Sequence, residues 1–568
     1  MDNGAITRKS DGSRCRRGDT SCFGEGIQMR RLLAVVTVAL AVAGVAEAST
    51  AQASVPPVRH GGYRPPPIAW HRCADSALRQ NHAQCGMLVV PLDYRHPGRT
   101  KIRLAVSRVR HTTPASQYQG VMLVNPGGPG GSGLIYSIIQ GFFPNHAGDA
   151  YDWIGFDPRG VGSSRPSVSC NAHFFHADRP PYRPSTRRIR AQWVTRSKAY
   201  AEQCTHRARA TLFGHMRTID NVRDMESLRK ALGQKQINYY GFSYGTYLGQ
   251  VYATKHPNRV RRFVFDGSVN PRRVFYQVNQ DQDRAFQKTL DIYFRWLAKY
   301  HAVYHVGGTY RDVRTTWLRT RTALDRHAAR GVLGGDELTD VFQNPAYYVF
   351  GYEGVASAYS AYLNHNNPRR LIALYRNANP TTPGADNNYA VYLGTQCTDA
   401  RWPRNQHRLD RDNTRLNRRY NYFTWQNAWF NGPCAYWHYP ARSHPVRVTG
   451  AHVHSPILMI NETFDPATPF AGALVVRRLF PTASLIEGRN GTTHAGSLSD
   501  GPCTMNALAA YLKHGRVPAR RSGNRSDKVC APVPKPNPRA AQPATWGSGD
   551  SAARALIRTS LEQAQRVS

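Results

Sequence analysis

Short apolar runs that end in turn-forming residues recur through the first half of the chain and return near its C-terminal end. Runs of this kind predict buried strands, while the longer amphipathic stretches between them predict helices. The candidate strands are residues 101–108, 121–125, 153–157, 237–241, 262–266, 457–461 and 483–487. Because strands and helices alternate, the pattern favours an α/β fold with a mostly parallel sheet flanked by helices.

The helix before the strand at 237–241 has clear limits. Asp220 is a residue type that caps helices, and Gly233 is one that ends them. Four apolar residues share one face at helical spacing: Val222, Met225, Leu228 and Leu232. We therefore expect Asp220 to begin this helix and Gly233 to close it.

After Pro271 the pattern changes to long, aromatic-rich amphipathic helices, such as 275–300 and 344–364. The chain is too long for one ordinary domain, so we expect a mainly helical cap inserted in the sheet. The stretch after Cys530 is rich in Pro and Gly, which predicts disorder. The expected layout is a linker at 54–68, a core at 69–271 and 452–530, a mainly helical cap at 272–451, and a disordered tail at 531–568.

From Met29 the chain reads as a secretory signal: two arginines, an apolar run and then small residues. We assign the signal peptide to residues 29–53, with cleavage near Ser49 or Ser54. Residues 1–28 are polar, and we interpret them as an upstream extension from a mis-assigned start. No other apolar run approaches the roughly 20 residues that span a bilayer. We therefore expect a secreted, extracellular protein without a stable membrane anchor.

Cysteine usage agrees with export. The chain has ten cysteines, and removing Cys15 and Cys22 with the leader leaves an even set, which suits an oxidising compartment. Such a set allows about a hundred pairings. Local clustering suggests Cys73 with Cys85, Cys170 with Cys204, Cys397 with Cys434, and Cys503 with Cys530.

The formal net charge of +39 raises the question of a nucleic-acid partner, since clustered Lys and Arg neutralise phosphates. Here the arginines are spread over nearly every segment, without a stacking motif. We interpret them as a solvated basic surface that meets no nucleic acid and adheres electrostatically to anionic cell-wall polymers. No His-Glu-x-x-His sequence or Cys/His spacing points to a metal, and we expect no cofactor.

The strongest chemical motif is the segment 241–245, Gly-Phe-Ser-Tyr-Gly, between an apolar strand and a helix-compatible stretch. This is the setting of a nucleophile elbow, where a sharp turn leaves the serine hydroxyl projecting above the sheet. The helix that follows turns its N-terminus toward developing negative charge. Ser243 is therefore the candidate nucleophile, and a chance match to a short pattern is the alternative.

A glycine-rich segment, residues 125–133, follows the strand at 121–125. Glycines let backbone N–H groups approach a tetrahedral oxyanion, so we expect Gly128 and Tyr244 to form the oxyanion hole. The same segment fits a dinucleotide fingerprint, with Asp157 at the end of the next strand. Against that alternative, Asp157 begins the turn sequence Asp-Pro-Arg-Gly, and a secreted protein meets little nicotinamide cofactor.

An elbow serine needs an imidazole base and a carboxylate to orient it, in the chain order Ser, Asp, His. Asp465 lies just after the strand at 457–461, and His494 follows the strand at 483–487. We favour these two as the catalytic pair. The alternatives are Asp266, which follows the strand after the elbow, and the histidines His452, His454 and His514.

The chain resembles the secreted tripeptidyl aminopeptidases of actinobacteria, which are α/β-hydrolases related to the proline iminopeptidases. The matching segments are NPGGPGGSG, DWIGFDPRGVGSS, INYYGFSYGTYLGQVYA, QCTD, ETFDPATP and the closing stretch from Cys503 to Cys530. By this resemblance Ser243, Asp465 and His494 form the triad, and Gly128 with Tyr244 supplies the oxyanion hole. One departure is visible, since the family commonly has Gly before the catalytic His and this chain has Thr493.

The resemblance implies a serine exopeptidase that releases tripeptides from the free N-terminus of peptides through an acyl-enzyme. Such an enzyme needs a carboxylate near the cap for the substrate ammonium, and Glu353 and Asp399 are candidates. Two other functions stay open. The same triad cleaves esters, which allows a secreted carboxylic ester hydrolase, and the fold also allows a non-catalytic surface binding protein.

Overall fold

The computed structural model describes residues 63–205, 210–439, 441, 444–499, 501–539 and 550–565. The expected extension at 1–28 and signal peptide at 29–53 lie outside the described residues. Within the described chain, no helix is both long and apolar enough to cross a membrane.

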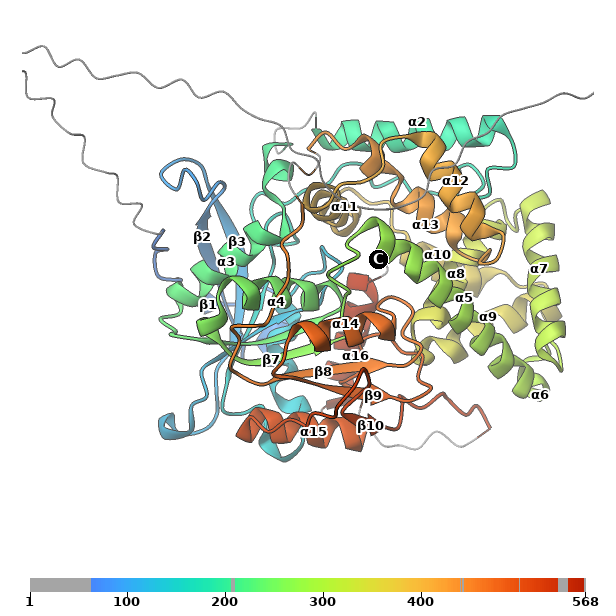
Figure 1. Cartoon of the computed structure of the whole chain (residues 1–568). Coiled ribbons are helices and arrows are strands. Elements are labelled where there is room, and N and C mark those ends of the chain that lie inside the picture. The colour runs from blue at the N-terminus through green and yellow to red at the C-terminus, as the bar shows by residue number, and fades with distance from the viewer. Residues whose placement is uncertain are drawn as a thin grey trace, which may run out of the picture. The chain divides into compact units, whose positions relative to one another are not determined.

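One sheet of ten strands forms the core (Figure 1). The strands are β1 (His71–Arg72), β2 (Gln84–Pro91), β3 (Lys101–Val109), β4 (Val121–Asn125), β5 (Asp152–Phe156), β6 (Ile237–Phe242), β7 (Val260–Asp266), β8 (Ile457–Glu462), β9 (Ala483–Gly488) and β10 (Lys528–Cys530). Their order is β1-β2-β3-β5-β4-β6-β7-β8-β9-β10. Pairs from β1 through β3 to β5 are antiparallel, and all others are parallel. Every expected strand is present, which confirms the mostly parallel α/β sheet.

Both faces of the sheet are covered. Along β4, Met122 and Val124 pack in one core and Leu123 in the other, as alternation along a strand requires. Burial on both faces is why the inner strands read as continuous apolar runs. The core helices are α1 (Ser76–Gln80), α2 (Arg187–Thr205), α3 (Thr218–Ala231), α4 (Tyr244–Lys255), α14 (Phe470–Leu479) and α15 (Pro502–His514).

Helix α3 begins earlier than the sequence suggests. Arg217 is its N-cap, and Asp220 lies in its first turn with its carboxylate paired to Arg217. The expectation that Asp220 caps this helix is therefore wrong. The N–H of Thr218 donates to the carboxylate of Asp399 from the cap (3.2 Å), so a distant residue supplies a partner at this helix end.

The cap is inserted between β7 and β8, and its helices lie together beside the sheet in Figure 1. They are α5 (Tyr276–Lys299), α6 (His301–Tyr304), α7 (Tyr310–Arg326), α8 (Gly335–Tyr347), α9 (Tyr352–His365), α10 (Arg369–Ala378), α11 (Asn387–Asp399), α12 (Gln406–Asn417) and α13 (Thr424–Phe430). The expected helix 275–300 matches α5. The prediction of a single helix at 344–364 is wrong, because the helix is interrupted between α8 and α9. At this break the backbone groups of Tyr347 and Val349 form hydrogen bonds with the loop at 493–494.

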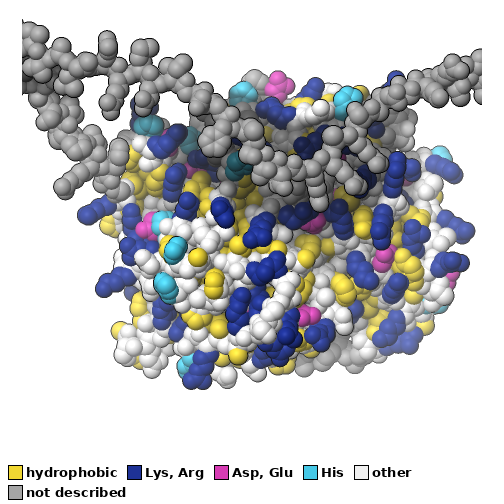
Figure 2. All heavy atoms as spheres, in the orientation of Figure 1, with side chains coloured by type: hydrophobic (Ala, Val, Ile, Leu, Met, Phe, Trp, Pro, Cys, Tyr) yellow, Lys and Arg dark blue, Asp and Glu magenta, His cyan; other side chains and the backbone are white. Residues whose placement is uncertain are grey.

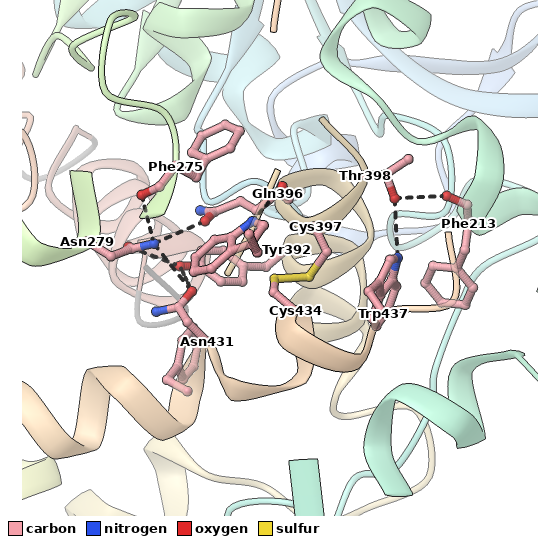
Figure 3. The surroundings of a disulfide bond; sticks show 12 residues. Phe213, Phe275, Asn279, Tyr392, Gln396, Cys397, Thr398, Asn431, Cys434 and Trp437 are labelled. Carbon is pink, nitrogen blue, oxygen red and sulfur yellow. Dashed lines mark hydrogen bonds between the residues drawn. A yellow bond between two sulfur atoms is a disulfide. The ribbon is translucent and has the colours of Figure 1, made fainter. Parts of the chain in front are cut away.

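Four disulfides join Cys73 to Cys85, Cys170 to Cys204, Cys397 to Cys434, and Cys503 to Cys530. The pairing expected from local clustering is confirmed. The Cys397–Cys434 bond ties α11 to the segment after α13 (Figure 3). Disulfides of this number are typical of proteins that fold in oxidising compartments.

Two segments after Cys530 contact the rest of the protein. The N–H of Val533 donates to the carboxyl group of Glu462 (2.6 Å), and the carbonyl oxygen of Pro536 accepts a hydrogen bond from Trp296 of α5 (2.9 Å). Helix α16 (Asp550–Gln565) packs on residues 134–142, with Ile557 buried. Both segments fall in the range where composition predicts a disordered tail, yet they make defined contacts.

Candidate active site

Ser243 stands between β6 and α4, at the carboxyl edge of the parallel strands. Its φ of 55° and ψ of −125° are strained for a serine, and its N–H donates to the carbonyl oxygen of Asp266 (2.9 Å). The turn is tight, since a Cβ on Gly245 would lie 2.6 Å from the carbonyl oxygen of Asn125. The local structure is the strand, sharp turn and helix of a nucleophile elbow.

Asp465 and His494 lie in the loops after β8 and β9, on the same edge of the sheet. Both side chains are buried, and Nδ1 of His494 is 2.8 Å from each carboxylate oxygen of Asp465. The N–H groups of Ala467 (3.0 Å) and Thr468 (2.8 Å) hold that carboxylate in place. A proton donated from Nδ1 leaves Nε2 as the basic nitrogen, and Nε2 has no hydrogen-bond partner among the described residues.

The segment Asp266-Gly267 lies between the serine and the imidazole. Asp266 accepts the Ser243 N–H, and a Cβ on Gly267 would lie 2.9 Å from Cε1 of His494. The structure therefore brings Ser243, Asp465 and His494 together at one site, although they are far apart in the sequence.

The alternative acid and bases have other positions. The carboxylate of Asp266 accepts the N–H of Ser497 (2.9 Å), and burial raises the pKa of this carboxyl group to about 6. The imidazole of His494 is instead hydrogen-bonded to the carboxylate of Asp465, in the loop after β8. The histidines His452, His454 and His514 are exposed. These positions favour the pair that the sequence analysis preferred.

The glycine-rich segment packs directly on the elbow. A Cβ on Gly127 would lie 2.9 Å from Cβ of Ser243 and 3.0 Å from the backbone nitrogen of Tyr244, so a larger residue would clash there. Gly128 follows with a φ of 102°, a conformation that favours glycine. The segment is thus next to the N–H of Tyr244, as an oxyanion hole requires, and Gly128 with Tyr244 stays the predicted donor pair.

Asp157 has a structural role in this segment. Its buried carboxylate accepts hydrogen bonds from the hydroxyl of Ser132 (2.6 Å) and from the N–H groups of Gly133 (3.0 Å) and Ser163 (2.8 Å). A carboxylate that binds ribose must keep its acceptors for the ligand. The contacts of Asp157 therefore argue against the dinucleotide alternative.

A cavity of about 520 Å³ is lined mainly by the cap, and two of its lining residues connect it to this site, although no residue of the triad lines it. Tyr347 lines it, accepts the N–H of His494 at its carbonyl oxygen (3.0 Å), and has its ring centroid 6.0 Å from that of the imidazole. Asn388 also lines it, and its carbonyl oxygen would lie 2.5 Å from a Cβ on Gly130. The size suits a small ligand, and the walls carry aromatic side chains that include Phe175, Phe286, Phe423 and Phe430.

Three carboxylates line this cavity, and one of them lacks a strong partner. Asp386 accepts two backbone N–H groups and two hydroxyls, and Asp340 pairs with Arg179 (2.7 Å). Asp283 accepts a hydrogen bond from Nδ2 of Asn427 (2.9 Å) and forms no ion pair within the described chain. It is 4% exposed, and burial raises the pKa of its carboxyl group well above the usual range.

The cap holds Asp283 through a network of amides, part of which Figure 3 shows. Asn427 donates to the carbonyl oxygen of Asn279 (2.9 Å) as well as to Asp283. Asn279, one turn before Asp283 on α5, donates to Gln396 (3.3 Å) and Asn431 (3.4 Å). The disulfide between α11 and the segment after α13 joins the backbones that carry these amides, so α5, α11 and α13 are connected at one end of the cavity.

Neither carboxylate that the sequence suggested for a substrate ammonium lines the cavity. Glu353 is half-buried at the start of α9, and Asp399 binds Thr218 of the core while burial raises its pKa to about 6. Sequence reasoning missed Asp283. A signal was present, because Asn279, Gln282 and Asp283 place polar side chains on the buried face of α5, which continues with mainly apolar residues.

Known proteins that resemble this chain share the fold described above. Residues 120–488 match the family model described as the alpha/beta hydrolase fold. A tripeptidyl aminopeptidase of Streptomyces lividans is 38% identical over 481 residues, which cover 83% of this chain and 88% of that protein. Serine protease Hip1 of Mycobacterium tuberculosis is 26% identical over 478 residues, 80% of this chain and 90% of that protein.

A further relative carries a different name. Carboxylesterase B of Mycobacterium tuberculosis is 27% identical over 491 residues, 80% of this chain and 89% of that protein. The match to the Streptomyces protein is the stronger one and spans most of both chains. Because the family model covers most of the chain and the Streptomyces relative is 38% identical over 83% of it, the chain is a serine hydrolase that belongs to the α/β-hydrolase family and, within it, to the family of the tripeptidyl aminopeptidases.

Proposed function

We propose that this protein is a secreted serine exopeptidase that releases short peptides, tripeptides above all, from the free N-terminus of peptide substrates. Ser243, Asp465 and His494 form its triad, and the N–H groups of Gly128 and Tyr244 form its oxyanion hole. The observation that carries the proposal is the cavity beside the imidazole, with a buried carboxylate in its wall.

The chemistry follows from the positions of these groups. Oγ of Ser243 attacks the scissile carbonyl carbon while Nε2 of His494 takes the hydroxyl proton. Negative charge passes to the carbonyl oxygen, where the two N–H groups stabilise it. His494 then gives the proton to the leaving amine, and a water molecule activated by the same nitrogen releases the peptide from the acyl-enzyme. Asp465 stabilises the imidazolium that forms in both steps.

The buried carboxylate of Asp283 supports recognition of a free N-terminus. Burial without an ion pair disfavours its charged form. A substrate ammonium placed beside it supplies the missing positive charge, while the aromatic walls accept apolar side chains. The distance between Asp283 and Ser243 then sets the length of the released peptide.

A panel of three substrates tests the proposal. Free and N-acetylated tripeptide anilides are compared with a simple ester, using the wild type and Ser243→Ala. We expect the free peptide to be cleaved at least about 30-fold faster than the acetylated one, because loss of a buried charge pair costs about 2 kcal/mol or more. Ser243→Ala should be inactive on all three. Equal cleavage of the free and blocked peptides would contradict the exopeptidase proposal.

The second candidate is an ester hydrolase, which the relative named carboxylesterase B favours. The same triad cleaves esters, and the cap alone selects the substrate. Turnover of the ester without either peptide would support this candidate. If the wild type turns over none of the three, the remaining candidate is a binding protein with the hydrolase fold.

Secretion is part of the proposal and has its own test. Four disulfides support export to an oxidising compartment. N-terminal sequencing of protein from the culture medium should find a start near Ser49 or Ser54. An intact Met1 in that material would contradict the assignment of residues 29–53 as a signal peptide.

The basic surface supports association with anionic cell-wall polymers. The chain has 75 Lys and Arg against 36 Asp and Glu, and Figure 2 shows Lys and Arg side chains spread over the visible face. Attraction of this kind is screened by salt. Binding to purified wall material should therefore fall steeply between low salt and about 0.5 M salt, where the Debye length is only a few ångströms. Binding that ignores salt would exclude an electrostatic cause.

A further inference from the structure

We infer that Glu462 is a positioning residue of the active site, whose carboxyl group ties the loop of His494 to the end of β8 and to the C-terminal segment at Val533. The inference rests on the triad of the proposed function. Glu462 makes no step of the reaction itself. It acts through the loops that carry the base and the acid, and through its charge beside them.

Glu462 touches both catalytic loops. It ends β8 and is 6% exposed. Its Oε2 accepts the N–H of Thr493 (2.5 Å), the residue before His494, and its Oε1 accepts the N–H of Val533 (2.6 Å). Its backbone carbonyl oxygen accepts the N–H of Asp465 (3.2 Å). Each carboxyl oxygen therefore has one backbone donor, and the same residue holds the turn that presents the catalytic carboxylate.

The loop before the imidazole is shaped around this carboxyl group. A Cβ on Gly491 would overlap the carboxyl group of Glu462, so a larger residue would displace that group from its two backbone donors. Thr493 is fully buried, and its Oγ1 accepts the N–H of Val349 (3.3 Å). The N–H of His494 donates to the end of α8. The cap therefore fixes this loop from one side and Glu462 from the other.

The charge on Glu462 is coupled to the site. Burial raises the pKa of its carboxyl group to about 8, and nearby carboxylates contribute in the same direction. At neutral pH the group is mostly neutral, and above about pH 8 it adds a negative charge near the Asp465–His494 pair. The titratable groups that interact with it are Asp465 and Asp266 at the sheet edge, Tyr352 on α9, and Lys535. Burial and the charge of Lys299 on α5 in turn lower the pKa of Lys535.

The substitution Glu462→Gln tests the inference, because Gln keeps the size but offers one acceptor where two backbone donors point. We expect kcat to fall 10- to 100-fold for both the peptide and the ester, with KM changed less than threefold. In the wild type, kcat should rise as the pH passes through about 8, since ionised Glu462 stabilises the imidazolium of the transition state. The variant should lack this rise.

A matched control is Glu487→Gln on the neighbouring strand β9. Glu487 accepts hydrogen bonds from the hydroxyls of Thr463 (3.2 Å) and Ser526 (2.5 Å). This variant should keep kcat within about threefold and keep the pH dependence. Thermal unfolding of both variants shows that they are folded.

A second variant, Val533→Pro, removes one donor to Glu462 within a segment that already has prolines on both sides. Without this N–H, the ionised carboxylate of Glu462 loses a hydrogen bond, and the pKa of Glu462 rises. The rise in kcat should therefore move to higher pH. A wild-type pH profile in Glu462→Gln, with kcat within threefold, would overturn the inference. If the wild type cleaves nothing, the proposed function fails instead, so the two failures are distinguishable.

Discussion

Replacing Asp283 with asparagine removes the group that becomes negatively charged when a substrate ammonium lies beside it, and it leaves the shape of the side chain nearly unchanged. Asp283 is 4% exposed and bonds Asn427, so a substrate ammonium beside it would form a buried ion pair. Removing one partner of such a pair costs about 2–5 kcal/mol. At about 1.4 kcal/mol per tenfold, kcat/KM for a peptide with a free N-terminus should fall roughly 30- to several-thousand-fold.

The assay compares the free tripeptide anilide with an ester that has no ammonium group. The ester rate of Asp283→Asn should stay within about threefold of the wild type. A matched control is Asp291→Asn on the same helix, whose carboxylate accepts hydroxyl hydrogen bonds from Tyr310 (2.8 Å) and Tyr422 (3.0 Å) outside the cavity. It should change neither rate. An unchanged peptide rate in Asp283→Asn, or an equal loss with both substrates, would refute the reasoning.

The same variant has a signature in stability. Folding raises the pKa of Asp283 above its unfolded value of about 4. Such a group favours the folded state at low pH, and that contribution is lost as the pH rises from about 4 toward the folded pKa. Asp283→Asn should therefore lose less stability than the wild type between pH 4 and pH 7 in urea unfolding. A parallel pH dependence in both proteins would contradict the burial argument.

Two further predictions concern the triad and the cap. Asp465→Asn should lower kcat by about 10⁴-fold, because the imidazole loses its orienting carboxylate. Asp266→Asn should lower kcat by less than about tenfold. A larger loss of kcat in Asp266→Asn than in Asp465→Asn in steady-state kinetics would exchange their roles. Replacing Cys397 and Cys434 by alanine opens a loop with a sequence separation of 37 residues and should cost about 4 kcal/mol in urea unfolding. Stability within about 1 kcal/mol of the wild type would exclude that contribution.

Much of the core was predictable because its signals are local. Strands buried on both faces appear as apolar runs whatever they pack against, and an elbow needs glycines within two residues of Ser243. The positions of Asp465 and His494 followed from the rule that loops after parallel strands meet at one edge of the sheet. Pairing of nearby cysteines was likewise favoured by short loops.

The sequence by itself thus determined the fold class and the candidate triad, and it suggested disulfide pairs that only the structure established. Only the tertiary structure showed the break between α8 and α9, the buried carboxylate of Asp283 in the cavity wall, and the contacts of Glu462 with Thr493 and Val533. The physical reason is that burial and charge compensation depend on which distant segments pack together. The sequence shows which face of a helix or strand a carboxylate occupies. Only the residues packed around that carboxylate show whether it binds a cation or a second loop.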